Sequence, residues 1–98
     1  TTPPHYIGPN ADIKRSFITQ GCMIDGEVKN SVLFTSAKID TGARVIDSVL
    51  MPGVIVEAGA VVQRALVADG VRIGKNAVVG SPDSEHIELA AKRVKGAE

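Results

Sequence analysis

The chain is poor in the residues that usually build a compact core or a covalent framework. It contains no Trp, one Tyr, two Phe and one Cys among 98 residues. A single thiol excludes an internal disulfide and predicts a reducing, cytoplasmic setting. Because 44% of the residues are nevertheless hydrophobic, we expect a core of thin aliphatic layers.

Two further absences narrow the function classes. Eleven Lys and Arg residues balance eleven Asp and Glu residues, so the chain lacks the excess positive charge of a general nucleic-acid binder. No apolar run approaches the ~18 residues that a membrane span requires. We therefore expect neither nucleic acid nor a membrane among the partners.

What the chain has instead is a regular return of aliphatic residues. They follow one another at steps of five, six and six residues, which gives a period of 17 residues. A shortened step separates Ile24 from Val28. Three steps per period predict a tube with three faces, and the shortened step predicts one irregular corner. The series is Ile7, Ile13, Ile18, Ile24, Val28, Leu33, Ile39, Val45, Leu50, Val56, Val62, Val67, Ile73 and Val79.

Two other patterns follow the same period. The residue two positions before each aliphatic from Ile13 onward is never larger than Val, and in a short strand it lies on the same side. Gly or Asn follows the aliphatic by three positions in the six-residue steps, except at Ser36, and both tolerate the left-handed backbone of a tight corner. We predict an all-β fold, a parallel β-helix of about four hexapeptide coils. An antiparallel sheet of short strands would not explain the period.

The segments PPHYI, GCMIDGEVKNSVLF and DSVLMPG add a family resemblance. Over residues 3–80 the chain resembles the carboxy-terminal left-handed β-helix domain of bacterial glucose-1-phosphate adenylyltransferase, also called ADP-glucose pyrophosphorylase. The resemblance implies left-handed coils and a parent enzyme of glycogen biosynthesis, which uses ATP and Mg²⁺ to convert glucose 1-phosphate into ADP-glucose and pyrophosphate. It places that chemistry in an amino-terminal nucleotidyltransferase domain, whose Gly-rich loop and metal-binding Asp this sequence lacks.

The resemblance also implies how the chain is organised. Residues 1–6, which open with TTPP, are expected to be a linker from the amino-terminal domain, residues 7–80 the β-helix, and residues 81–98 a C-terminal tail. The segment alone should carry no catalytic site and no cofactor. It should support assembly with the amino-terminal domain and with other subunits of a homo- or hetero-tetramer, near a site for anionic metabolite effectors.

The tail leaves two questions open. Lys92, Arg93 and Lys95 cluster where the resemblance implies basic residues of an effector site, and they would contact phosphate groups. A solvated basic end is the other interpretation. The alternation of Ile87 and Leu89 fits a strand, whereas Ser84 followed by Glu85 fits the start of a capped helix.

An enzymatic role is the alternative function, since hexapeptide β-helices also serve as acyltransferases and as zinc-dependent carbonic anhydrases. An acyltransferase commonly uses a His between neighbouring coils as general base, and a catalytic zinc site of that kind needs three imidazoles. The chain has only His5 and His86, which flank the coils, so we expect no metal site. Cys22 falls at a small inward position and is expected to be a buried, inert thiol.

One outer face of the predicted tube is unusual. The residue just before an inward aliphatic should face solvent, and on two faces it is often polar, as at Glu27 and Lys38. On the third face every such residue is apolar, and so are two residues just after the inward aliphatic. This face predicts an interface with the missing domain or with another subunit, unless the tail folds back over it. We call these six residues the apolar stripe: Phe17, Val32, Phe34, Val49, Met51 and Leu66.

Overall fold

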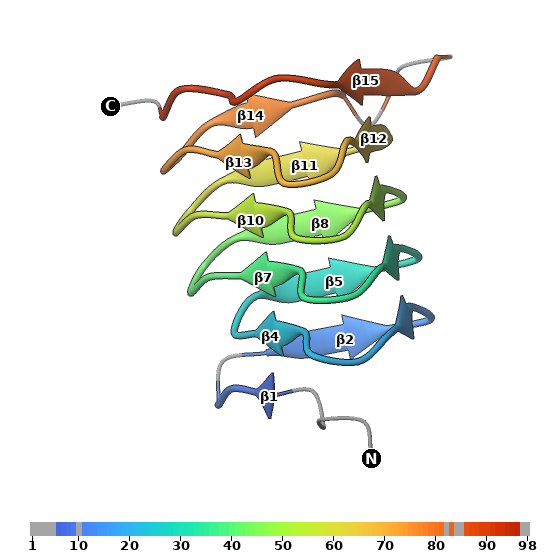
Figure 1. Ribbon diagram of the computed structural model, residues 1–98, viewed down its shortest axis with the longest axis vertical. Helices are drawn as coiled ribbons and strands as arrows, with labels where there is room; N and C mark the ends of the chain where they lie inside the picture. Colours follow the sequence, from blue (N-terminus) through green and yellow to red (C-terminus); the bar gives the residue numbers. More distant parts are fainter. Residues whose placement is uncertain (1–5, 10, 82, 84–85, 97–98) are drawn as a thin grey trace.

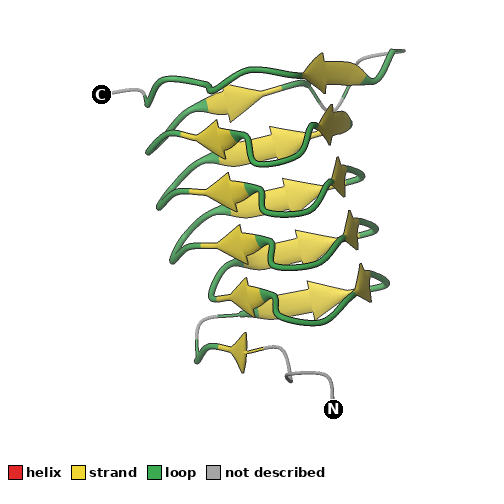
Figure 2. Ribbon diagram, in the orientation of Figure 1, coloured by secondary structure: helices red, strands yellow, loops and turns green. Residues whose placement is uncertain are grey.

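The computed structural model describes residues 6–9, 11–81, 83 and 86–96, and these residues form a tube with three sides (Figure 1). The strands are only two or three residues long and follow the three sides in turn. Loops join them, and no helix occurs in the part of the chain that is described (Figure 2). Most of the linker expected at residues 1–6 lies outside the described residues.

Each side of the tube is one five-stranded parallel sheet. Sheet A contains β1 (Tyr6–Ile7), β4 (Met23–Ile24), β7 (Lys38–Ile39), β10 (Ile55–Val56) and β13 (Arg72–Ile73). Sheet B contains β2 (Asp12–Lys14), β5 (Glu27–Lys29), β8 (Arg44–Ile46), β11 (Val61–Gln63) and β14 (Val78–Val79). Sheet C contains β3 (Phe17–Ile18), β6 (Val32–Leu33), β9 (Val49–Leu50), β12 (Ala65–Val67) and β15 (Glu88–Ala90). The predicted left-handed parallel β-helix of about four coils is confirmed.

The core is the stack of inward aliphatic residues that the period predicts. From Ile24 to Val79 every member of the series is buried, and so are the small residues two positions before them. The first coil is less closed, because Ile7 is 44% exposed and Ile13 and Ile18 are only partly buried. Thin aliphatic layers therefore fill the tube without large aromatic rings.

The corners also follow the predicted pattern, with one extension. The described corner residues of the six-residue steps have positive φ, including Ser36, the exception in the sequence pattern. Asn10, the remaining predicted corner, lies outside the described residues. The five-residue steps turn through non-glycine residues with φ between 47° and 49°, which the sequence did not reveal: Arg15, Asn30, Asp47 and Arg64.

A ladder of serine side chains stabilises the corner between sheets B and C. The Ser31 hydroxyl donates to the Lys29 carbonyl at 2.7 Å and accepts the Ser48 backbone N–H at 3.1 Å. Ser16 and Ser48 repeat this arrangement one coil below and above. Ser31 and Ser48 are buried, so each hydroxyl satisfies backbone groups that would otherwise lose their hydrogen bonds.

Replacing Ser31 with Ala should destabilise the tube by about 1–3 kcal/mol, because the buried N–H of Ser48 would lose its acceptor. Urea unfolding followed by circular dichroism would measure the change. Thr35→Ala is the matched control, since Thr35 is exposed and its loss should cost less than about 0.5 kcal/mol. Equal midpoints for the two variants would contradict a stabilising ladder.

The irregular corner lies where the shortened step predicts it. Ile24 pairs with Ile39 and Val28 with Val45, so Asp25–Glu27 replaces a longer turn in the coil above. Gly26 occupies the inner side of this corner and is buried. A Cβ there would collide with the backbone carbonyl oxygens of Ala43 and Asp40. The tight corner therefore depends on a residue without a side chain.

The tail continues the coil instead of leaving it. Strand β15 pairs with β12, with Leu89 beside Leu66, a separation larger than the 17-residue period. Val94 then forms a bridge to Ile73 on sheet A. The open question of helix or strand is thus answered as strand. We name residues 86–96 the C-terminal cap, because they cover the ends of sheets C and A above the last full coil (Figure 1).

Candidate effector pocket and interface

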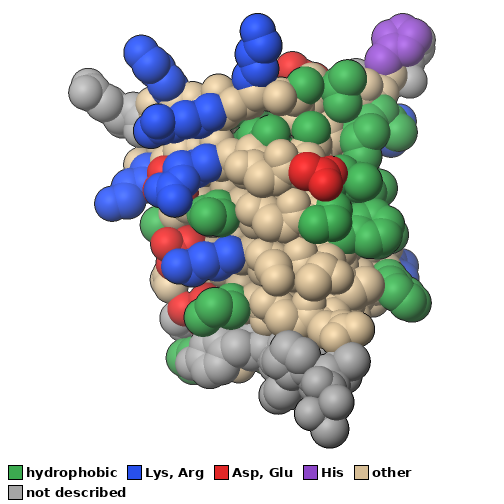
Figure 3. Space-filling view, in the orientation of Figure 1, with side chains coloured by type: hydrophobic (Ala, Val, Ile, Leu, Met, Phe, Trp, Pro, Cys, Tyr) green, Lys and Arg blue, Asp and Glu red, His purple; other side chains and the backbone are tan. Residues whose placement is uncertain are grey.

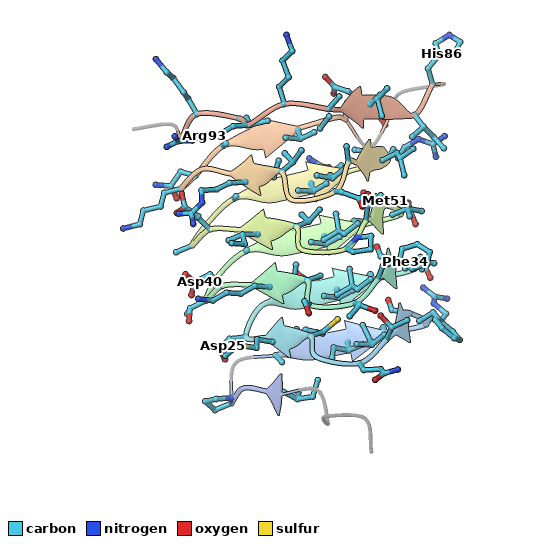
Figure 4. The ribbon with its side chains drawn as sticks, in the orientation of Figure 1. Asp25, Phe34, Asp40, Met51, His86 and Arg93 are labelled. Carbon is cyan, nitrogen blue, oxygen red and sulfur yellow. The ribbon has the colours of Figure 1, made fainter. Side chains whose placement is uncertain are left out.

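The apolar stripe runs along the outside of sheet C. Phe17 pairs with Val32, Val32 with Val49, and Val49 with Leu66, so these side chains stack on successive coils. Phe17 is 67% exposed and Leu66 36% exposed, while Val32 and Val49 are partly buried. In Figure 3 hydrophobic side chains gather along the edge formed by this sheet, and Figure 4 places Phe34 and Met51 on the same side of the tube.

The C-terminal cap extends the apolar stripe and does not fold back over it. Leu89 stands beside Leu66 in register and is 64% exposed. Ile87, just before β15, is also exposed. The described residues of the tail therefore leave the apolar stripe open, and they add one more layer to it.

Two of the three predicted effector-site residues line one pocket at the C-terminal end of the tube. The pocket has a volume of about 290 Å³, and we call it the basic pocket. Lys95 is exposed just beyond Val94 and is not part of the lining. The basic pocket is lined by Asp69, Gly70, Val71, Arg72, Ala91, Lys92 and Arg93.

Arg72 is the pocket residue that sequence reasoning missed. In the sequence it is one of the polar residues just before an inward aliphatic, which suggests an ordinary outward charge, and its Nη1 does donate to Glu57 Oε2 at 3.1 Å. The bridge between Ile73 and Val94 brings Arg93 alongside Arg72, since each Arg precedes a bridging residue. Blue side chains accordingly collect at the C-terminal end of the edge that carries Arg93 (Figures 3 and 4). The lining of the basic pocket thus includes three cationic residues and one acidic residue, Asp69.

A second hollow lies at the irregular corner of sheets A and B. It measures about 460 Å³ and is lined by Asp12, Gly26, Glu27, Thr41, Gly42, Ala43 and Arg44. Glu27 bridges Lys29 at 2.6 Å and Arg44 at 2.8 Å. The hydrogen bond from Lys29, and then the contacts of Arg44, lower the pKa of Glu27 below its usual value. Arg44, the one cationic residue in this lining, is already paired with Glu27, so this hollow offers a weaker site for an anion than the basic pocket.

Both hollows have the same structural cause. Val94 follows Ala90 by the same four residues that separate Val28 from Ile24, where regular steps have five or six. A shortened corner leaves the longer turn of the neighbouring coil without a partner stacked on it. The basic pocket lies beside Gly70, where an added Cβ would meet no atom within 4 Å.

Of the two His residues of the enzymatic alternative, the structure describes only His86. His5 lies outside the described residues, and His86 is exposed just before β15 and lines neither hollow. Cys22 is fully buried, and its Sγ lies 3.3 Å from the Phe34 carbonyl oxygen. In the described part of the chain, no three His, Cys, Asp or Glu side chains cluster in a way that could hold a metal ion. These residues also form no helix that could cross a bilayer.

The three-sided tube with its hexapeptide coils defines the class of hexapeptide-repeat β-helices. Residues 6–94 match the family described as GlmU-like, C-terminal hexapeptide, and the chain belongs to this family. The curated relatives that the chain matches share one enzyme name within this broader family. Glucose-1-phosphate adenylyltransferase of Acetivibrio thermocellus is 37% identical over 87 residues, which are 89% of this chain and 20% of the relative.

Two Bacillus enzymes of the same name agree with this match. The glucose-1-phosphate adenylyltransferase of Bacillus cytotoxicus is 42% identical over 94% of this chain and 25% of the relative. That of Bacillus thuringiensis is 40% identical over 79% of this chain and 20% of the relative. The chain is therefore homologous to one part of these enzymes, and it spans about a fifth to a quarter of their length.

Proposed function

We propose that this chain is the assembly and regulatory β-helix of a cytoplasmic glucose-1-phosphate adenylyltransferase. The observation that carries the proposal is the open apolar stripe on sheet C, in a chain that corresponds to only 20–25% of its relatives. A soluble protein rarely leaves such a stripe bare. Its partners would be an amino-terminal nucleotidyltransferase domain and the other subunits of a tetramer.

The reaction would take place outside this segment. An amino-terminal domain would use ATP and Mg²⁺ to transfer an adenylyl group to glucose 1-phosphate and release pyrophosphate. The β-helix would supply a rigid tube, whose outer face can hold that domain and neighbouring subunits in fixed positions. Its regulatory part would be the basic pocket, where Arg72, Lys92 and Arg93 would attract the phosphate groups of a sugar phosphate or nucleotide effector.

Replacing both Lys92 and Arg93 with Ala in the enzyme that carries this sequence should weaken activation. A hydrogen bond to a charged group contributes about 1.5–3 kcal/mol, so the half-activating effector concentration should rise by at least about tenfold. Turnover would be measured while a sugar bisphosphate and a nucleoside monophosphate are titrated separately. The double variant Lys14→Ala and Lys38→Ala removes two exposed cations elsewhere and serves as control. Identical activation curves for both double variants would exclude an effector role for the basic pocket.

A further inference from the structure

We propose that the C-terminal cap is a ligand-controlled element: a phosphate-bearing anion in the basic pocket holds the cap on the tube, and the docked cap extends the apolar stripe. This inference rests on the effector role proposed above and adds the way in which binding would reach the interface.

The first reason is a repulsion between the C-terminal cap and the coil beneath it. The bridge between Ile73 and Val94 sets Arg93 beside Arg72 on neighbouring parallel strands. Like charges at directly paired positions destabilise strand pairing. The Arg72 guanidinium already contacts Glu57 on the coil below, and that carboxylate lies on the far side from the cap. An anion between Arg72 and Arg93 would convert the repulsion into two attractive contacts.

The second reason is that the C-terminal cap lies at the edge of its sheet and buries few side chains. β15 pairs with the tube only through β12, as the edge strand of sheet C, and this pairing is bounded by the bonds from Glu88 N–H to the Arg64 carbonyl and from Ala68 N–H to the Ala90 carbonyl. On sheet A, the Val94 N–H donates to the Arg72 carbonyl and the Gly74 N–H donates to the Val94 carbonyl. Among the described residues of the cap only Ala90 is buried, and Val94 is partly buried. Such a segment opens at a lower free energy than the closed coils.

The third reason is that one short segment serves both surfaces. Leu89 extends the apolar stripe on sheet C, while Lys92 and Arg93 line the basic pocket. Ala90 lies between them and is buried in the core. Detachment of the C-terminal cap would therefore remove Leu89 from the stripe and open the pocket at the same time. Binding of an anion and docking of a partner on the stripe would then favour each other reciprocally.

Hydrogen exchange of the 98-residue chain, with inorganic pyrophosphate as the probe, tests this inference. At ten times its dissociation constant, a ligand that binds only the closed state slows exchange through the open state by about tenfold. The slowing should appear at amides that join the cap to the tube, and the four cap amides to follow are those of Ala68, Gly74, Glu88 and Val94. The amides of Arg44 and Val61, which bond between inner coils, should not change. Uniform slowing of all these amides would contradict a separate cap opening.

The variant Arg93→Ala sharpens the test. Its four cap amides should not respond to pyrophosphate, and without ligand they should exchange no faster than in the unchanged chain, because a repulsion has been removed. Arg44→Ala, which removes the same side chain from the distant pair with Glu27, should keep the full response. Faster exchange of the cap in Arg93→Ala without ligand would overturn the argument from repulsion.

Calorimetry separates failure of this inference from failure of the proposed effector site. Saturable heat from pyrophosphate without slower exchange of the cap amides would leave the effector site standing and refute the coupling. Absence of both heat and slowing would refute the effector site and the coupling together. Equal ionic strength from sodium chloride, which screens the repulsion but does not bridge the two Arg side chains, should slow the cap amides less than pyrophosphate does and controls for general screening.

Discussion

Gly26→Ala should be among the most destabilising single substitutions in the tube, at a cost of about 3 kcal/mol. A methyl group at this buried corner would collide with the backbone carbonyl oxygens of Ala43 and Asp40. Neither oxygen can move alone, because Ala43 accepts the Glu27 N–H at 2.9 Å and Asp40 accepts the Ala43 N–H at 3.1 Å. Urea unfolding followed by circular dichroism would measure the free energy of unfolding.

Gly70→Ala is the informative comparison. A Cβ at Gly70 would meet no atom within 4 Å, but the residue has a φ of +68°, so the cost is backbone strain of about 1 kcal/mol. Gly26 has the opposite combination of a crowded site and no left-handed backbone. A larger loss of unfolding free energy for Gly70→Ala than for Gly26→Ala would contradict this prediction. It would mean that backbone strain at a left-handed position costs more than the steric collision at the shortened corner.

The tube could be predicted from the sequence because each coil repeats the same local solution. An inward aliphatic such as Val45, a small residue such as Ala43 and a turning residue such as Gly42 lie within a few positions of one another. A 17-residue period then aligns successive coils without further information. The apolar stripe was predictable for the same reason, since Val32, Val49 and Leu66 keep this period on the outside.

What the sequence did not reveal depends on contacts that break the period. Arg64 adopts a φ of 47°, which an Arg residue avoids on its own, and only the stacking of the coils requires it there. The extra residues after Gly80 displace β15, so neither the pairing of Leu89 with Leu66 nor that of Val94 with Ile73 follows from spacing. Arg72 therefore looked like an ordinary surface charge.

Changing both Val49 and Leu66 to Lys should convert an associated chain to a monomer. If the apolar stripe is an interface, the unchanged chain should self-associate through it. Burying two ammonium groups in an apolar contact costs several kcal/mol unless they find partners. The coils should remain folded, because Val49 and Leu66 point away from the core while their neighbours Leu50 and Val67 are fully buried. Sedimentation equilibrium would measure the mass of the chain before and after the change.

The matched control adds the same two charges to the other faces. Ile55 on sheet A and Val61 on sheet B also precede inward residues and are partly buried, so Ile55→Lys with Val61→Lys tests whether added charge alone prevents association. This control should keep the mass of the unchanged chain, and circular dichroism should show the same strand content in both double variants. Equal masses for the unchanged chain and the Val49 and Leu66 variant would mean that the apolar stripe is not the interface. Dissociation by the control as well would show that charge, and not the position of the stripe on sheet C, decides association.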